Sequence, residues 1–186
     1  MLEKRIEKSV KVLKLAADMS REYYGQPMIL CYSGGKDSDV LLHLAETHLD
    51  KKDFEVLNSH TTLDAPETVY HIRRVFARLR GGGIAAHIDY KKDKDGKPIT
   101  MWSLIVDHGT PPTRVMRYCC QTLKETSTPN RMAVIGVRAA ESTKRQGRDA
   151  FGIRGGATQK LNFFHLTIRR KCIAKQKIVT PYGIAH

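Results

Sequence analysis

The chain has 186 residues, enough for one ordinary domain with a buried core, and its 41% of hydrophobic residues excludes a chain that is disordered by composition. The 32 Lys and Arg residues exceed the 19 Asp and Glu residues and give a formal net charge of +13, so we expect an anionic partner such as a nucleotide or a nucleic acid. No apolar run approaches the ~18 residues that a membrane helix requires, and the four cysteines follow no secretory signal peptide, which favours a reducing, cytoplasmic setting over a disulfide framework.

The first part of the chain predicts a strand, a glycine turn and a helix in succession. Apolar residues recur at helical spacing over residues 1–24, which predicts an amphipathic helix packed on the domain. A continuous apolar run at residues 28–32 is typical of a strand covered on both faces. Residues 33–38 form the turn, and from residue 39 to about residue 48 the apolar positions shift to a helical period.

The same alternation continues in the following segments. Further strands are expected at residues 54–57, 84–88 and 132–137, and further helices at residues 67–79, 102–106 and 117–125. We assign Trp102, at the start of the short helix, to the core. Alternating strands and helices favour an α/β fold in which a mostly parallel sheet carries helices on both faces.

The end of the chain has no stable hydrophobic period, and only residues 163–168 resemble a strand. We therefore expect a main domain over residues 1–147, including the N-terminal helix, and a basic C-terminal extension over residues 148–186 that could begin a truncated C-terminal part. Between Arg138 and Lys177, eleven Lys or Arg residues stand against only two acidic residues. Such a run is either a solvated face or a contact surface for nucleic acid.

The turn at residues 33–38, which we call the glycine loop, has the composition of a phosphate cradle. It consists of Ser33, Gly34, Gly35, Lys36, Asp37 and Ser38. The glycines let phosphate oxygens approach main-chain N–H groups, the serines add hydroxyl donors, the lysine adds positive charge, and the following helix points its N-terminus at the same place. The aspartate has two candidate roles, capping that helix or holding Mg²⁺. Neither G-x-x-x-x-G-K-[ST] nor G-x-G-x-x-G occurs, which excludes a Walker-type loop and a dinucleotide fingerprint.

The glycine loop resembles the loop of the PP-loop superfamily, also called adenine nucleotide α-hydrolase-like. Three further stretches resemble, in the same order along the chain, the phosphoadenosine phosphosulfate (PAPS) reductase family within it. They are Thr61-Thr62 with Pro66-Glu67-Thr68, Arg117-Tyr118-Cys119-Cys120 with Leu123-Lys124, and Gly136-Val137-Arg138 with Glu141-Ser142 and Arg145. Together the matches cover about residues 20–146.

This resemblance implies a Rossmann-like or flavodoxin-like three-layer sandwich that binds ATP or PAPS across its strand ends, with Mg²⁺ as a metal partner. It places Thr61 and Thr62 near the nucleotide. It implies that Arg138 and Arg145 neutralise phosphate or sulfate charge, a role that suits the bidentate guanidinium group. The candidate catalytic residues are Lys36, Asp37 and Arg138.

The sequence also departs from the family. His60 stands where similar relatives commonly carry Asp, and the cysteine-bearing C-terminal segment of thioredoxin-dependent PAPS reductases has no counterpart near Cys172. The Cys119-Cys120 pair is similar to cysteines that help ligate an iron–sulfur cluster in adenylyl-sulfate reductases. Because such a cluster needs four thiolates and Cys31 is expected inside a strand, we expect no complete cluster within this chain.

These observations predict an enzyme of the ATP pyrophosphatase or adenylating type, acting at the α-phosphate or sulfate anhydride in sulfur or nucleic-acid modification. A PAPS reductase is the nearest alternative. A nucleotide- and nucleic-acid-binding domain or fragment without turnover is the alternative from another class. The sequence leaves open the true nucleotide, the acceptor, the catalytic completeness of the chain and its oligomeric state.

Overall fold

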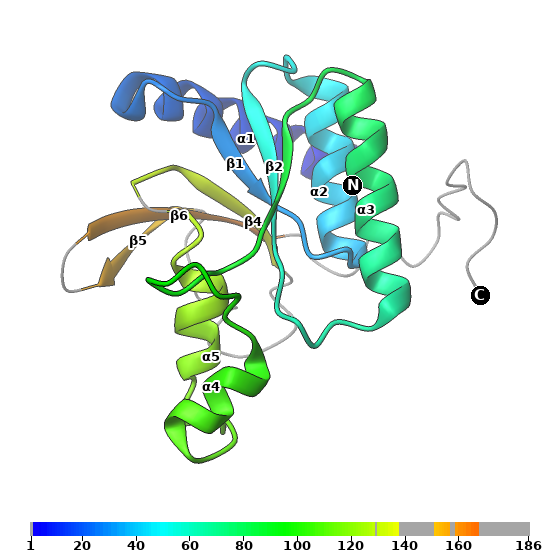
Figure 1. The fold of residues 1–186 in the computed structure, drawn as a ribbon. Coiled ribbons are helices and arrows are strands. Elements are labelled where there is room, and N and C mark those ends of the chain that lie inside the picture. Colours follow the sequence, from blue (N-terminus) through cyan, green and yellow to red (C-terminus); the bar gives the residue numbers. More distant parts are fainter. Residues whose placement is uncertain (1, 129, 138–150, 157–158, 168–186) are drawn as a thin grey trace.

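A computed structural model describes residues 2–128, 130–137, 151–156 and 159–167. Its sheet has six strands in the order β3-β2-β1-β4-β6-β5 (Figure 1). The strands are β1 (Met28–Cys31), β2 (Phe54–Ser59), β3 (Ala86–Asp89), β4 (Ala133–Val137), β5 (Phe151–Gly156) and β6 (Gln159–Thr167). Neighbouring strands pair in parallel throughout, except that β5 runs antiparallel to β6 at the edge. The predicted mostly parallel sheet is confirmed.

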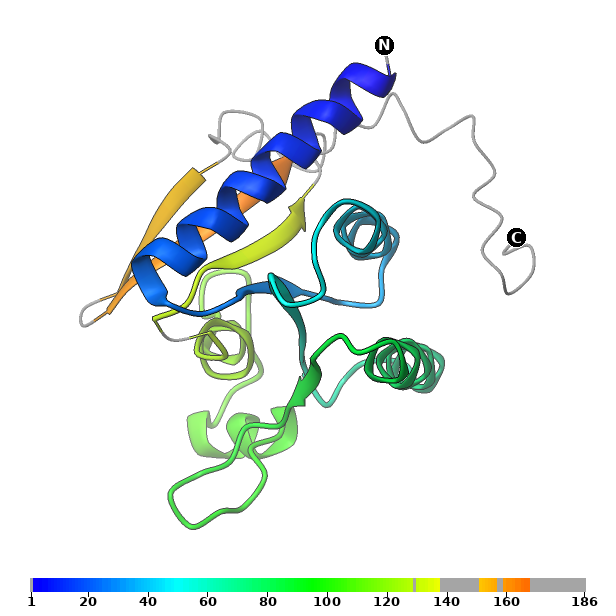
Figure 2. The same ribbon diagram turned by 90° about the horizontal axis from the view of Figure 1, so that it is seen from above.

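Helices cover both faces of this sheet. They are α1 (Leu2–Tyr24), α2 (Lys36–His48), α3 (Pro66–Gly81), α4 (Met101–His108), α5 (Tyr118–Cys120) and the π-helical segment η1 (Gln121–Glu125). Figure 2 shows α1, α2 and α3 on one side of the sheet and α4 and α5 on the other. The order of the strands explains this division. From β1 the chain adds β2 and then β3 toward one edge of the sheet, and it then returns past β1 to form β4 on the other side. Because such crossovers are right-handed, a reversal of direction places the connecting helices on the opposite face. The three-layer, Rossmann-like fold expected from the sequence is confirmed.

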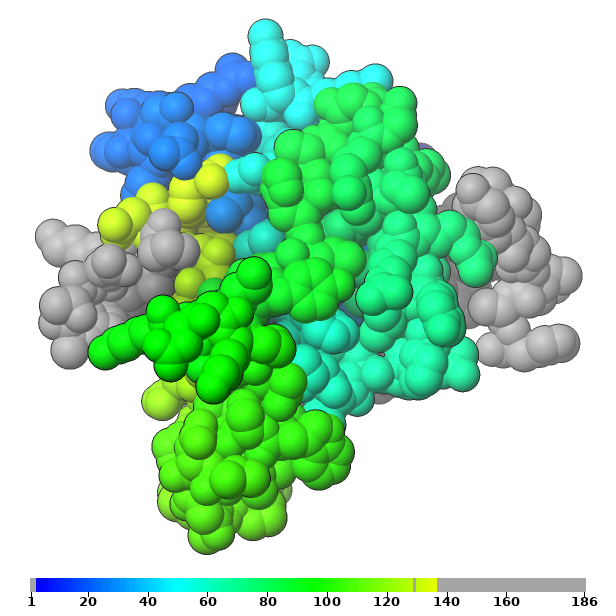
Figure 3. All heavy atoms as spheres, viewed as in Figure 1, coloured from blue at the N-terminus to red at the C-terminus, as the bar shows by residue number. Residues whose placement is uncertain are grey.

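The main core lies between the sheet and the helices α1, α2 and α3. Its largest fully buried side chains come from all of these elements and include Leu13, Met28, Leu41, Phe54 and Phe76. A smaller apolar cluster on the other face joins α4 to η1 and contains Met101, Leu104 and Leu123. Figure 3 shows the green α4 and its neighbouring segments projecting from the body of the molecule.

Several expected elements differ in extent from those observed. Helix α2 begins at Lys36, inside the glycine loop, and the helix expected at residues 117–125 is one short α-helical turn followed by η1. Strand β6 is longer than the expected segment at residues 163–168, and β5 was not expected. The sequence of β5, Phe-Gly-Ile-Arg-Gly-Gly, is rich in glycine, which is depleted in strands, so its pattern gave no signal.

The assignment of Trp102 to the core is wrong, because this residue is 67% exposed. Helix α4 buries Met101 and Leu104, and a residue directly after Met101 is turned by about 100° around the helix axis, away from that face. The division of the chain between residues 147 and 148 stays a prediction, although two strands beyond it lie in the same sheet. In the described part of the chain, no helix combines the length and apolar character needed to span a bilayer.

Candidate functional site

The glycine loop lies at the carboxyl end of β1, in the middle of the sheet. Strand β1 pairs with β2 on one side and β4 on the other, and the chain reaches these two neighbours through helices on opposite faces. This is the topological switch point, where open α/β sheets bind their ligands. Gly35 is the N-cap of α2, which begins at Lys36, so the first N–H groups of the helix are directed at the loop. The sequence alone predicted this loop, and the fold places it where an anion would bind.

Two glycines allow neighbouring elements to approach the loop closely. Gly34 has φ of +74°, and a Cβ atom there would lie 3.0 Å from Ile72 Cγ1 of α3. A Cβ atom on Gly136 of β4 would lie only 2.8 Å from the carbonyl oxygen of Asp37. The loop is therefore held between α3 and β4. The positive φ favours glycine at position 34, and the backbone contact with Asp37 requires glycine at position 136.

Hydrogen bonds of Ser38 close the loop on itself. The Ser38 hydroxyl donates to the Gly35 carbonyl oxygen at 2.7 Å and accepts from the Gly35 N–H at 3.1 Å. The Ser33 hydroxyl donates to Ser38 Oγ at 3.3 Å. Since a hydroxyl has a single proton, Ser38 uses its own proton inside the loop, whereas Ser33 is exposed at the surface. A direct contact between Ser38 and phosphate stays a prediction.

The acidic residue of the loop, Asp37, is the second residue of α2 and does not occupy the N-cap. A carboxylate in the first turn is favoured by the positive end of the helix dipole. Among the described residues, no group of three or more His, Cys, Asp or Glu side chains is arranged to hold a metal ion. Mg²⁺ in nucleotide sites commonly takes one or two carboxylates together with phosphate oxygens. Asp37 is therefore compatible with a magnesium ion that arrives with the nucleotide.

The two threonines predicted to lie near the nucleotide stand in the segment that follows β2. Thr61 is buried, and its hydroxyl donates to Asp64 Oδ2 at 2.6 Å. Thr62 has φ of +64°, and its hydroxyl oxygen accepts the N–H of Met101 at 2.9 Å. Both side chains thus hold the segment in shape, and their contact with a nucleotide stays a prediction. Asp64 was not foreseen, although its position three residues after Thr61 is a spacing at which side chains commonly bond to the backbone.

His60 lies just before these threonines, at the end of β2. Its ring packs against Tyr90, with a distance of 5.0 Å between the ring centroids. This contact joins the ends of β2 and β3 beside the site. His60, at which the sequence departs from the family that it resembles, thus has an aromatic partner.

The cysteine pair borders a cavity of about 170 Å³ beside Thr61. Its lining consists of Thr61, Leu63, Met101, Cys119, Cys120, Leu123 and Lys124. Arg117 Nη2 donates to Cys120 Sγ at 3.4 Å. Burial opposes ionisation of Cys120, but the hydrogen bond and charge of Arg117, with smaller contributions from Cys119 and Lys124, outweigh burial and lower the pKa of this thiol. Burial and the neighbouring Cys120 raise the pKa of Cys119.

Cys31, predicted to lie within a strand, is the last residue of β1, and burial raises its pKa to about 12. Burial thus keeps this thiol in its protonated form near neutral pH. Arg138, Arg145 and Cys172, for which the sequence suggested functional roles, lie outside the described residues.

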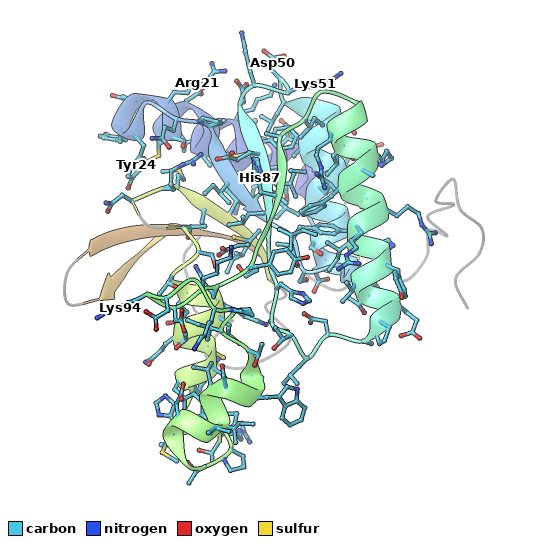
Figure 4. All side chains as sticks on the ribbon, viewed as in Figure 1. Arg21, Tyr24, Asp50, Lys51, His87 and Lys94 are labelled. Atoms are coloured by element: carbon cyan, nitrogen blue, oxygen red, sulfur yellow. The ribbon has the colours of Figure 1, made fainter. Side chains whose placement is uncertain are left out.

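A second hollow, larger than the cavity beside the cysteine pair, lies elsewhere. It has a volume of about 240 Å³ and is lined by residues that include Glu46, Phe54, Arg78 and Ile84. Phe54 begins β2, so this hollow belongs to the amino ends of the strands, the same edge at which Figure 4 shows Arg21, Asp50 and Lys51. The loop chemistry and the switch point both favour the opposite edge.

Comparison with known proteins identifies a matching family and solved structures of similar fold. A family model, the phosphoadenosine phosphosulfate reductase domain, matches residues 27–168, well over half of the chain. None of the curated proteins compared with the chain matches it.

Among solved structures, Candida glabrata FMN adenylyltransferase in complex with FAD and inorganic pyrophosphate aligns with a TM-score of 0.50 and 16% identity, over 90% of this chain and 53% of that chain. Another structure of the same enzyme aligns with a TM-score of 0.49 and 16% identity, over 90% of this chain and 51% of that chain. The chain thus spans about half the length of that enzyme, and at this identity the likeness concerns the fold alone.

Proposed function

From the membership of this chain in the phosphoadenosine phosphosulfate reductase domain family of the PP-loop superfamily, we propose that the glycine loop binds the phosphate end of ATP and that the protein releases pyrophosphate from it. The observation that carries this proposal is the place of the loop, at the switch point of the sheet and at the N-terminus of α2. The adenylyl group would pass to an acceptor in sulfur or nucleic-acid modification, or to water. Inorganic pyrophosphate is bound in the FMN adenylyltransferase structure of similar fold, which is compatible with such a site.

Catalysis would depend on fixed positive charge around the departing pyrophosphate. The exposed Lys36 ammonium and the N–H groups at the start of α2 would stabilise the charge that develops on the phosphate oxygens. Asp37 would hold Mg²⁺ together with the phosphates, and the ion would supply charge neutralisation. Arg138 and Arg145 would complete the neutralisation from the segment that follows β4.

The test is to incubate the protein with ATP and Mg²⁺ and to separate AMP, ADP and pyrophosphate. We expect AMP and pyrophosphate in equal amounts, and we expect Lys36→Ala to lower ATP affinity at least tenfold, because a charge-assisted contact to phosphate is worth roughly 1.5–3 kcal/mol. Lys94→Ala, at an exposed lysine in the segment between β3 and α4, is the matched control and should change nothing. If Lys36→Ala binds ATP as well as the unmodified protein does, the loop assignment is wrong. If ATP binds without forming AMP, the binding-only alternative is favoured.

A PAPS reductase is the second candidate, and the observation that favours it is the thiol pair beside Thr61. Cys119 and Cys120 border the same cavity as this threonine, and one of the two thiols has a lowered pKa. Incubation with PAPS and a dithiol reductant would test this function by the release of sulfite. Sulfite formation without AMP formation from ATP would replace the first proposal with this one.

A further inference from the structure

Tyr32, Asp39 and His71 form a hydrogen-bonded group directly behind the glycine loop, and nothing in the proposed chemistry uses them. We infer that this group is a positioning device that fixes the loop in the shape required by the phosphate end of the nucleotide. The inference rests on the proposed nucleotide binding and adds to it a set of residues that do not touch the ligand.

The main chain of Tyr32 is fixed at the last point before the loop begins. Its N–H donates to the Leu57 carbonyl oxygen of β2 at 2.8 Å, and its carbonyl oxygen accepts from Asn58 Nδ2 at 2.8 Å. Asn58 is itself buried, so both bonds are shielded from water. Ser33, the next residue, is the first residue of the loop, so the position of Tyr32 determines where the loop begins.

The side chain of Tyr32 joins the loop to two helices. Its hydroxyl donates to Asp39 Oδ1 of α2 at 2.5 Å and lies 3.0 Å from His71 Nε2 of α3. When the hydroxyl proton goes to the carboxylate, the phenol oxygen can accept a proton from the Nε2–H tautomer of His71. Burial first, and then the hydrogen bond to Asp39, raise the pKa of Tyr32, so the phenol stays neutral and keeps this donor.

The surroundings of the phenol leave it little freedom. Tyr32 is 2% exposed, and its ring packs against Phe76 of α3 with 5.8 Å between the ring centroids. Glu46 of α2 and Arg78 of α3 are the other charged groups that act on the phenol, and they pair with each other by two hydrogen bonds. The group is therefore a defined contact between the sheet, α2 and α3.

The same two helices also contact the loop itself. The Asp39 N–H donates to the Gly35 carbonyl oxygen at 3.0 Å, so Asp39 closes the first turn of α2 while its side chain holds Tyr32. Ile72, next to His71 on α3, fills the space at Gly34, where a Cβ atom would lie only 3.0 Å away. Loss of the phenol hydroxyl would release α2 and α3 from the residue that precedes the loop. The affinity for the phosphates would fall, because phosphate binding depends on loop geometry, whereas the affinity for the adenine base would not change.

The decisive measurement compares the affinities of the Tyr32→Phe protein for ATP with Mg²⁺ and for adenosine, by calorimetry or ligand-observed NMR. We expect the ATP affinity to fall roughly tenfold, the scale of one buried hydrogen bond, and the adenosine affinity to change less than twofold. Tyr23→Phe, at an exposed tyrosine near the end of α1, is the matched control and should leave both affinities unchanged. Asp39→Asn keeps an acceptor oxygen for the phenol and should bind ATP better than Asp39→Ala does.

Each outcome decides between the inference and its alternatives. Equal losses for ATP and adenosine would indicate a merely structural role and overturn the inference, as would an unchanged ATP affinity of Tyr32→Phe. Failure of the unmodified protein to bind ATP would instead overturn the proposed function, and the inference with it. If Tyr32→Phe does not fold, His71→Asn at a half-buried position repeats the test, and the same selective loss for ATP is expected.

Discussion

At the scale of single residues, the candidate site combines exposed side chains with buried side chains that shape the loop. Lys36 is exposed and free to meet phosphate, whereas Ser38 is buried and bonded within the loop. The sequence predicted both residues from one motif and assigned both to phosphate binding, Lys36 through its charge and Ser38 through its hydroxyl. Only the structure separates them, because the direction of the single Ser38 proton depends on the loop conformation.

The positioning residues were not predictable in this way. Tyr32 and Asp39 are seven positions apart, and His71 is thirty-nine positions beyond Tyr32. No local spacing rule joins residues at these separations, and α3 reaches Tyr32 only because of the right-handed crossover after β2. The sequence predicted that Tyr32 ends an apolar strand, and its hydroxyl carried no signal of its own.

Thiol chemistry gives a prediction at this scale. Arg117 lowers the pKa of Cys120, whereas burial raises the pKa values of Cys119 and Cys31. Since the thiolate is the reactive form, we expect iodoacetamide to modify Cys120 first near neutral pH, with a rate that levels off at a lower pH than the rate at Cys119. Mass spectrometry of peptides over a pH series measures both rates.

Two variants make the thiol experiment specific. Arg117→Ala removes the favourable charge and should shift the Cys120 profile to higher pH, while Arg114→Ala removes a nearby exposed arginine as the control. Faster labelling of Cys31 than of Cys120 would contradict the assigned pKa order.

At the scale of elements, the sequence predicted best where a segment is buried or strongly periodic. Strands β1 and β2 and helices α2 and α3 follow from apolar runs and a helical period, and their bounds differ from expectation by only a few residues. Strand β5 has too many glycines to give such a pattern, and it forms by pairing with β6. The short helix α4 was predicted, but its buried face was not. A helix of about two turns has too few apolar positions to show which face is buried, so the orientation of Trp102 could not be read from the sequence.

Helix α1 supplies a prediction about stability. Leu13 is 1% exposed and belongs to the same apolar cluster as residues of β1 and α2. Leu13→Ala would leave a cavity there, and we expect the free energy of unfolding to fall by about 2–5 kcal/mol. Leu15→Ala, at a residue that is 48% exposed on the same helix, is the control and should cost much less. Urea denaturation followed by circular dichroism measures both, and equal losses would show that α1 does not pack as described.

At the scale of the whole molecule, a net charge of +13 acts on any anionic ligand. We expect the association rate for ATP to fall as salt rises from low concentration, because screening shortens the reach of the field to about 8 Å at physiological ionic strength. Stopped-flow measurements over a salt series test this, with uncharged adenosine as the reference ligand. A rate for ATP that is independent of salt would show that the excess charge lies away from the site.

The contact between Gly136 and Asp37 changes what should count as the signature of this site. A contiguous hexapeptide describes only half of the constraint, since strand β4 must also present a residue without a side chain to the Asp37 carbonyl oxygen. A sequence that has Ser-Gly-Gly-Lys-Asp-Ser but a bulkier residue opposite it could not pack the strand and the loop in this way. The packing at position 136 therefore supplies a physical reason for the glycine in the Gly136-Val137-Arg138 stretch, and it ties that stretch to the glycine loop in space.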